Sequence, residues 1–376
     1  MELDDLREKI NDTDEKIAEL FLERMNLCLD ISRFKIKNSM PVFQADREKY
    51  ILDKMAEKFP DELKRSSTVF YQTIMDISKC RQYQEFFADK DTIEHFPLDM
   101  SKNCSVAVPG TKGSFSQLAC MKLFKKGSIT FFDRFEQVFE AVEKQQVDFG
   151  VVPIANSTAG SVTATYELLK KHDLKICAST KLKISHCLAA KKGMDKKDIE
   201  IVYSHEQALM QCSEFLDRNK FKAHSYANTA LAAELAAGSD RPIGAICSEE
   251  CAELNGLEII EKDIANAAAN FTRFIVISKQ TLCSENADII SVSLSLPHER
   301  SALYRLLTKF SVAGLNLTMI ESRPIANTDF DAVFYLDFEG SIRDAQVAML
   351  INELKQELTY FKFLGNYEEI TGGAEK

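Results

Sequence analysis

The sequence predicts a multidomain chain in which an all-α segment is followed by an α/β segment and then by an α+β segment. Three observations support this division. Residues 1–88 contain no glycine, and their apolar residues recur at helical spacing. From Val106 onward, short β-rich runs alternate with helical stretches. From about residue 288, the expected elements follow the order βαββαβ, which is typical of a ferredoxin-like fold.

The helical segment, residues 1–88, is expected to form three helices. The apolar residues of the first helix recur at steps of three and four, at Leu3, Leu6, Ile10, Ile17, Leu20, Phe21, Leu27, Ile31 and Phe34. Pro41 interrupts the pattern, and residues 46–59 and 63–86 are the second and third helices. At about 1.5 Å per residue the first helix is roughly 50 Å long. Because two shorter helices cannot cover such a rod, we expect dimerisation.

The rest of the chain is predicted in three parts. Residues 89–103 lack a clear period and are interpreted as a linker. Residues 104–280 are the α/β segment, with expected strands at 147–154 and 273–278 and helices at 206–217 and 227–237. Residues 288–367 open with a strand whose serines would face water, followed by a helix (301–313), strands (315–323 and 331–338), a helix (343–357) and a strand (361–367).

Composition limits the possible partners. The net charge of −10 disfavours nucleic acid and membrane surfaces. The acidic start lacks the order of a signal peptide, and no apolar run is long enough to span a bilayer. Ten cysteines without a Cys-x-x-Cys pair and six histidines without ligand spacing predict reduced thiols and no metal. We therefore expect a cytoplasmic protein without a metal or other cofactor.

Cationic residues of the first helix share a face. Arg24 and Lys35 are eleven residues apart, so they differ by about 20° around a helix of roughly 100° per residue. Arg7 differs from Arg24 by about 100° and points elsewhere. Arg24 and Lys35 can face one site, whereas Arg7 could reach the site of a partner in a dimer.

The motifs LREKI (6–10), LER (22–24) and ADRE (45–48), with Lys35 and Gln82, resemble the all-helical chorismate mutases across nearly all of residues 3–88. The resemblance implies an intertwined dimer. It also implies that Arg24 and Arg7 of the neighbouring subunit bind the substrate carboxylates and that Lys35 and Gln82 donate to the ether oxygen. Arg47 and Glu48 would complete the pocket, the carboxylate near the substrate hydroxyl, with Ser78 a further candidate. Gln44 stands where the family commonly has Asp, which implies weakened recognition.

These residue types suit the reaction that the resemblance implies. Conversion of chorismate to prephenate is a pericyclic rearrangement, so it requires no nucleophile, metal or cofactor. Guanidinium groups can hold a dicarboxylate in its reactive conformer. Fixed donors can stabilise the charge that develops on the ether oxygen.

Four motifs of the α/β segment resemble prephenate dehydratases over residues 104–280: VAVPGTKGSFSQLAC (106–120), FGVVPIANSTAGSV (149–162), YSHEQALMQC (203–212) and NFTRF (270–274). The resemblance implies two subdomains of periplasmic-binding-protein-like architecture. Thr272 would be the central catalytic residue, Asn156, Ser157 and Thr158 would line the pocket, and Gln211 and Ser204 would assist. Arg273 is a candidate carboxylate partner.

The sequence departs from that family at Ala155, where a glutamate usually precedes Asn156. Loss of one such helper can cost roughly a hundredfold in rate. Two interpretations follow: a dehydratase that is slow or compensated, or a mutase whose second pocket binds prephenate without converting it and serves as a sensor. The retained Thr272 favours reduced but present activity. A non-catalytic amino-acid sensor is a third alternative, which the nearly complete set of mutase residues disfavours.

The segment GLNLTMIESRP (314–324) resembles the ACT regulatory domain of the same family, over residues 288–367. The resemblance implies a phenylalanine site between the helix start at Ser301, Ala302 and Leu303 and the strand residues Asn316, Leu317, Glu321 and Ser322 of a neighbouring subunit. Ser301 replaces a glycine of the family. It should cap its helix well, but its side chain occupies space that glycine leaves free. We expect weaker inhibition by phenylalanine. We also expect a bifunctional enzyme of phenylalanine biosynthesis that forms a homodimer or a homotetramer.

Overall fold

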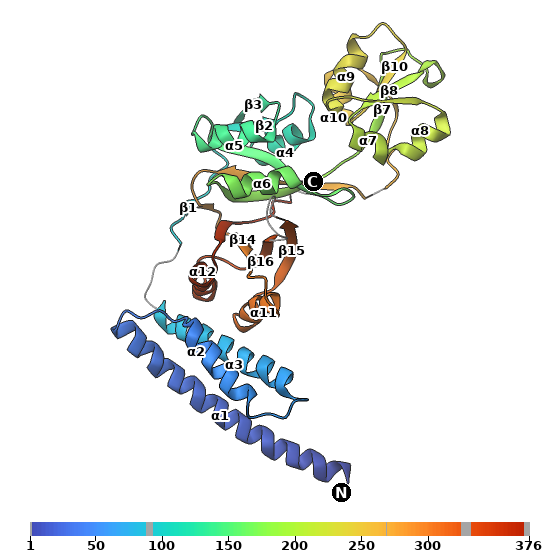
Figure 1. Ribbon diagram of the computed structural model, residues 1–376. Helices are drawn as coiled ribbons and strands as arrows, with labels where there is room; N and C mark the ends of the chain where they lie inside the picture. The colour runs from blue at the N-terminus through green and yellow to red at the C-terminus, as the bar shows by residue number, and fades with distance from the viewer. Residues whose placement is uncertain (1, 88–92, 268, 325–331, 372–376) are drawn as a thin grey trace. The chain divides into compact units, whose positions relative to one another are not determined.

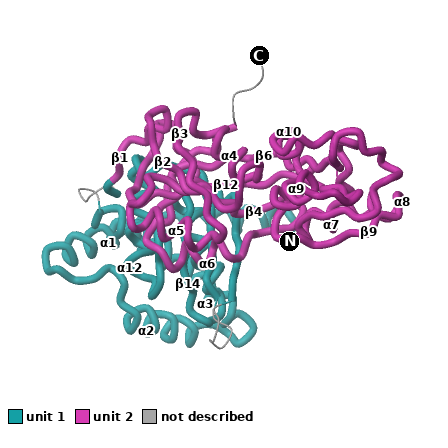
Figure 2. The backbone as a smooth tube through the Cα atoms, turned by 90° about the horizontal axis from the view of Figure 1, so that it is seen from above, with its two compact units in different colours: residues 1–94, 290–363 teal, residues 95–289, 364–376 magenta. Residues whose placement is uncertain are grey.

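A computed structural model describes residues 2–87, 93–267, 269–324 and 332–371. The chain divides into two compact units, which Figure 2 shows in different colours. Unit 1 consists of residues 1–94 and 290–363, and unit 2 of residues 95–289 and 364–376. The predicted helical and βαββαβ segments, which are nearly two hundred residues apart, therefore belong to the same unit.

The first part of unit 1 is the predicted set of three helices: α1 (Leu3–Lys37), α2 (Ala45–Ala56) and α3 (Lys64–Phe86). Both α1 and α2 pack against α3 (Figure 1). All nine apolar residues that define the period of α1 are exposed, from 39% for Phe21 to 64% for Leu20. Within the described residues of a single chain, most of the apolar face of α1 is thus uncovered.

The second part of unit 1 has the predicted element order: β14 (Ile289–Ser295), α11 (Ala302–Val312), β15 (Leu317–Pro324), β16 (Ala332–Glu339), α12 (Ala345–Glu357) and β17 (Phe361–Tyr367). The strands lie in the order β15-β16-β14-β17. Helices α11 and α12 lie on one side of this sheet, and both contact α3 (Figure 1). The predicted ferredoxin-like topology is confirmed.

One detail of β14 differs from the prediction. Ser291 and Ser293 were expected on a wet face, but both are buried. The Ser291 hydroxyl donates to the Asp337 carboxylate, and the Ser293 hydroxyl pairs with the Tyr360 hydroxyl at 3.1 Å. Because these hydroxyls have hydrogen-bond partners, their burial is tolerated, and the alternation of side chains does not mark an exposed face.

Unit 2 has two lobes, as predicted. In the first lobe the strands lie in the order β6 (Lys175–Lys183), β12 (Phe271–Ser278), β4 (Phe149–Asn156), β2 (Cys104–Pro109) and β3 (Gly127–Phe132). Helices α4 (Phe115–Leu123), α5 (Phe135–Glu143) and α6 (Thr163–Lys171) pack against these strands. Strand β12 returns from the second lobe and inserts between β4 and β6, antiparallel to both. This insertion brings the ends of two distant motifs together.

In the second lobe the strands lie in the order β11 (Glu258–Glu261), β7 (Cys187–Ala190), β10 (Ile243–Cys247), β8 (Ile201–Ser204) and β9 (Lys222–Ser225). Its helices are α7 (Glu206–Gln211), α8 (Ser213–Asn219), α9 (Thr229–Gly238) and α10 (Glu249–Leu254). The predicted helix 206–217 is therefore interrupted at Cys212. The chain crosses between the lobes twice, after β6 and after β11.

Part of the predicted linker, residues 89–103, forms a short strand. Its residues 89–92 lie outside the described residues, but Phe96 and Pro97 form β1, which pairs in parallel with β13 (Leu282–Cys283).

The cysteines are buried, apart from the half-buried Cys104. In the described part of the chain, every helix is too short or too polar to cross a membrane.

Candidate active sites

The helical module brings four predicted residues together between α1 and α3. The Arg24 guanidinium donates to the Ser78 hydroxyl and to the Ile74 carbonyl, the latter at 3.3 Å. The Lys35 ammonium donates to Oε1 of Gln82 at 3.1 Å and to the Val42 carbonyl at 2.7 Å. Arg24 and Lys35 thus lie on one face of α1, opposite two residues that are one turn apart on α3.

Burial shapes the chemistry of this cluster. Lys35, Ser78 and Gln82 are all buried. Burial lowers the pKa of the Lys35 ammonium, although the nearby Cys28 and Glu48 act in the opposite direction. Oε1 of Gln82 accepts from Lys35, and its Nε2, which has no acceptor among the described residues, can donate to a ligand. The cluster can therefore offer several fixed donors to an anionic or ether oxygen.

Glu48 on α2 lies beside this cluster and is held by two cations. Its carboxylate is 3.0 Å from Nζ of Lys79 and 3.9 Å from the guanidinium of Arg305. Lys79 also lies 3.0 Å from the fully buried Asp76. Sequence reasoning missed Lys79, Asp76 and Arg305, because a helical period does not reveal which buried charges become neighbours.

Of the other predicted residues of this module, Arg7 and Arg47 are exposed. Arg7 is exposed and pairs with Asp4 at 3.2 Å. It lies about 25 Å from Arg24 along α1, since 17 residues separate them at about 1.5 Å each. Arg47 is exposed, with its guanidinium 5.2 Å from the centre of the Tyr50 ring. Gln44 is the residue before α2, and its side chain caps no amide in the described chain.

A second cluster forms in unit 2, where Asn156 at the end of β4 lies opposite Thr272 of β12. The Asn156 carbonyl Oδ1 accepts from the backbone amides of Thr158, at 3.0 Å, and Ala159, at 2.9 Å. These amides fix the orientation of the side-chain amide. Its Nδ2 must then donate, and it does so to the Thr272 hydroxyl at 2.9 Å and to Asn270 at 2.8 Å.

The hydrogen bonds of this cluster form a chain that runs in one direction. His186 Nε2 lies 3.0 Å from Oε1 of Gln211, and Nε2 of Gln211 donates to the Thr158 hydroxyl at 2.9 Å. The Thr158 hydroxyl donates to Oδ1 of Asn156 at 2.7 Å. Burial lowers the pKa of His186, although its bond to Gln211 acts in the opposite direction. A neutral His186 that donates from Nε2 completes a chain of donors that ends on Thr272.

The Thr272 hydroxyl therefore accepts from Asn156, and no side chain among the described residues takes its own proton, which can go to a ligand. Asn270 supports the chain from the side, because its Nδ2 donates to Oε1 of Gln211 at 3.1 Å. Sequence reasoning named neither His186 nor Asn270 as a site residue. Asn270 is the first residue of the NFTRF motif, which was a usable signal, whereas His186 had none.

Three predicted pocket residues have other partners. Ser204 is buried and donates to the Ile246 carbonyl at 2.6 Å. The Ser157 hydroxyl accepts from the Phe271 amide at 2.9 Å and so ties the ends of β4 and β12 together. Arg273 lies 3.0 Å from the Tyr367 hydroxyl and 3.6 Å from the Glu369 carboxylate. Successive strand residues point to opposite faces, so Arg273 faces away from Thr272.

The same alternation applies to Ala155. It is the register partner of Arg273, whereas Asn156 is the partner of Thr272. Directly opposed strand residues share a face of the sheet. A glutamate at position 155 would thus lie beside Arg273, where Glu369 now supplies a carboxylate, rather than beside Thr272.

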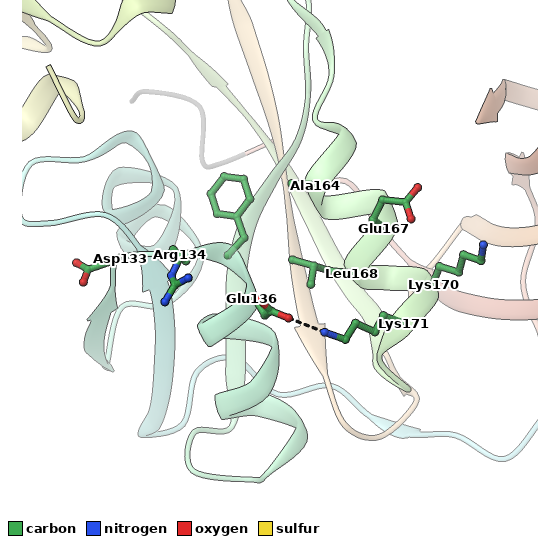
Figure 3. Close-up of a pocket in the computed structure, with 9 residues that line it drawn as sticks. Asp133, Arg134, Glu136, Ala164, Glu167, Leu168, Lys170 and Lys171 are labelled. Carbon is green, nitrogen blue, oxygen red and sulfur yellow. Dashed lines mark hydrogen bonds and ion pairs between the residues drawn. The ribbon is translucent and has the colours of Figure 1, made fainter. Parts of the chain in front are cut away.

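A separate pocket of unit 2, of about 820 Å³, lies between α5 and α6 (Figure 3). Its lining includes both acidic and basic side chains, and Lys171 pairs there with Glu136 at 2.5 Å. In the described part of the chain, none of the predicted site residues lines this pocket. Its mixed charges select no class of ligand.

The predicted effector residues lie at two places in unit 1. Ser301 precedes α11 and has a left-handed backbone with φ of 64°, and its hydroxyl caps no amide in the described chain. The prediction of a good serine cap is therefore wrong, because capping residues adopt an extended backbone. Ala302 and Leu303 begin α11. Asn316, Leu317, Glu321 and Ser322 lie on or just before β15, the edge strand in the sheet order.

Comparisons with known proteins match both modules of the chain. The chorismate mutase type II family model matches residues 6–83, and the prephenate dehydratase model matches residues 106–282. The bifunctional chorismate mutase/prephenate dehydratase of Aquifex aeolicus is 32% identical, over 97% of this chain and 98% of that protein. The enzyme of the same name from Escherichia coli K12 is 31% identical, over 96% and 95%.

A solved structure is also similar. The prephenate dehydratase of Arthrobacter aurescens, in complex with L-Phe, has a TM-score of 0.65 and 28% identity, covering 70% of this chain and 90% of that chain. The two family models, the near full-length similarity to the bifunctional proteins and the two residue clusters lead to one conclusion. The chain belongs to the family of bifunctional chorismate mutase/prephenate dehydratases.

Proposed function

We propose that this chain rearranges chorismate to prephenate in its helical module and converts prephenate to phenylpyruvate between the lobes of unit 2, on the route to phenylalanine. One observation carries the proposal. A single chain assembles two separate polar clusters, Arg24–Ser78–Lys35–Gln82 in unit 1 and His186–Gln211–Thr158–Asn156–Thr272 in unit 2. Each cluster suits one of the two reactions.

In the mutase site, Arg24 would bind a substrate carboxylate, and Lys35 and Gln82 would donate to the ether oxygen as its bond breaks. Lys35 already lies against Gln82, so both donors are in position before the substrate arrives. Preorganised donors stabilise developing charge without having to reorient. Glu48 would meet the substrate hydroxyl.

In the dehydratase site, Thr272 would donate its hydroxyl proton to the hydroxyl group of prephenate, which leaves its ring carbon as water. The carboxylate on the para ring carbon departs as carbon dioxide, and the electron pair of its bond to the ring makes the ring aromatic. A threonine hydroxyl is a weak acid and needs support. The donor chain from His186 to Asn156 supplies it, because each bond donates toward Thr272 and stabilises the charge left on its oxygen.

The proposal favours full bifunctionality over a mutase with a sensing appendage. The support is the position of Ala155, which shares a face with Arg273 and not with Thr272. The carboxylate that the family usually has at this position is therefore no direct partner of the reacting threonine.

The chain would form at least a dimer, paired through α1. Nine apolar residues of this one helix are exposed, and burial against a partner helix would remove them from water. An antiparallel pairing of α1 about its middle, near residue 20, would set residue 7 of one helix beside residue 33 of the other. Along the helix axis, position 33 lies between Arg24 and Lys35. Arg7 would therefore reach the mutase site of the partner and bind a substrate carboxylate there.

The βαββαβ part of unit 1 would be an ACT regulatory domain that binds phenylalanine. The Arthrobacter aurescens relative was solved in complex with L-Phe. The left-handed backbone of Ser301 supports weak binding here, since glycine adopts this conformation without strain and leaves room for a ligand.

Chorismate supplied to the purified protein should disappear while phenylpyruvate forms. The variant Ala155→Glu should change the dehydratase rate far less than the roughly hundredfold effect of a proton-donating helper. Parallel assays of chorismate loss and phenylpyruvate formation measure both steps. Prephenate that accumulates in the wild type and is consumed only by Ala155→Glu would instead select the mutase-with-sensor alternative.

Sedimentation equilibrium should give at least twice the chain mass of 42.5 kDa. The variant Leu20→Glu should dissociate the assembly and abolish mutase activity, because it places a charge in the proposed helix pair. In a monomer the 64% exposed Leu20 would accept glutamate without consequence. A wild-type mass of one chain would contradict the proposal.

Ser301→Gly should tighten phenylalanine binding by roughly fivefold, equivalent to about 1 kcal/mol, because it removes a side chain that occupies space beside the proposed ligand site. Titration calorimetry and inhibition of phenylpyruvate formation measure this effect. Ser301→Ala is the matched control, since it keeps the Cβ atom and should bind as weakly as the wild type. Tight, inhibitory binding of phenylalanine by the wild type would defeat this prediction.

A further inference from the structure

Unit 1 contains a buried network of charges that joins the mutase helices to the proposed regulatory domain. From α2 and α3 come Glu48, Asp76 and Lys79, and from α11 and α12 come Arg305, Lys309, Glu353 and Glu357. Arg305 is the most exposed of these side chains, at 24%. Buried charges at a junction between modules are stable only when they are paired.

Arg305 is the α11 residue of the network that contacts Glu48. Its Nε lies 3.5 Å from the Asp76 carboxylate, and a terminal nitrogen lies 3.9 Å from the Glu48 carboxylate. Lys79 lies 3.0 Å from both of these carboxylates. The two carboxylates thus share two cations, one from the mutase helices and one from α11.

Removing Arg305 would leave Lys79 to neutralise both carboxylates. Asp76 is fully buried, whereas the Glu48 side chain is 16% exposed. The buried carboxylate needs a cation more, because water cannot solvate it. Lys79 would therefore stay with Asp76, and Glu48 would lose its fixed orientation.

The same helix leads to the proposed effector site. The Arg305 amide donates to the Ser301 carbonyl at 2.9 Å, which is the first helical hydrogen bond of α11. A pocket of about 710 Å³ is lined by Glu48, Val69 and Gln72 of the mutase helices and by Ser301, Tyr304 and Arg305. Any shift of the start of α11 would move Arg305 directly.

We propose that Arg305 is a positioning residue of the mutase reaction: it holds the Glu48 carboxylate in the orientation that meets the substrate hydroxyl. The mutase site is then completed by a residue of the regulatory domain. This inference rests on the proposed mutase function, which gives Glu48 its role.

A double-mutant cycle on the full-length chain tests the inference. Arg305→Ala should lower the mutase kcat about tenfold or more with a smaller change in KM, because it misplaces a group that acts in the transition state. Arg305→Lys should restore part of the loss. In the Glu48→Gln background, Arg305→Ala should cause no further loss, since residues that act through one another are not additive.

Two controls separate positioning from folding. Arg81→Ala removes an exposed arginine of α3 that donates to Gln84, and it should leave the mutase unchanged. The dehydratase activity of each variant, measured with prephenate supplied directly, should also stay unchanged. If circular dichroism shows that Arg305→Ala does not fold, Arg305→Lys replaces it in the double-mutant cycle. Arg305→Lys should lower the mutase kcat severalfold in the wild-type background and cause no further loss in the Glu48→Gln background.

Two outcomes would overturn the inference: equal loss of both activities, or the same loss of kcat from the Arg305 variant in the wild-type and Glu48→Gln backgrounds. A wild-type protein that leaves chorismate unchanged would instead defeat the proposed function itself. The two failures are therefore distinguishable.

Discussion

The need to pair buried charges determines how unit 1 is built. Burial alone would lower the pKa of Lys309, but Glu353 and Glu357 outweigh that effect and raise it. Burial raises the pKa of Glu353, which Lys309 opposes, and burial with the Glu353 charge raises the pKa of Cys80 to about 12. Removing one partner of such a set typically costs about 3–5 kcal/mol. The helical and βαββαβ segments are thus bound together by charge as well as by apolar contact.

Unit 2 shows the corresponding constraint for neutral polar groups: its buried amides and hydroxyls need hydrogen-bond partners. Each amide and hydroxyl between His186 and Thr272 has both a donor and an acceptor role assigned by its neighbours. Gln211 comes from the second lobe, and Asn156 and Thr272 come from the first. The donor chain therefore draws its members from both lobes.

Local periodicity was enough to predict the three helices, the βαββαβ order and the shared face of Arg24 and Lys35. It could not predict the union of residues 1–94 with residues 290–363, because no local pattern specifies contacts between distant segments. The buried Ser291 and Ser293 show that an alternating pattern reports the two faces of a strand but not what covers them. The left-handed backbone at Ser301 was missed because serine is common at helix starts in a different conformation.

Sequence motifs identified some of the residues in the two sites but not others. The motifs pointed to Asn156, Thr158, Gln211 and Thr272, and the structure joins these residues by hydrogen bonds. The sequence suggested that Ala155 replaces a catalytic carboxylate, and strand register places this position opposite Arg273. Arg305 and His186 lie outside every motif, since their importance comes only from what they touch.

Two variants, Lys35→Ala and Thr272→Val, each assayed with chorismate and with prephenate, distinguish two separate reaction sites in one chain from a single shared site. Lys35→Ala should lose chorismate conversion by about a hundredfold or more while still forming phenylpyruvate from prephenate. Thr272→Val should convert chorismate at the wild-type rate and accumulate prephenate. Loss of both activities in either variant, or of neither activity in both, would show that the two reactions do not use these two separate sites.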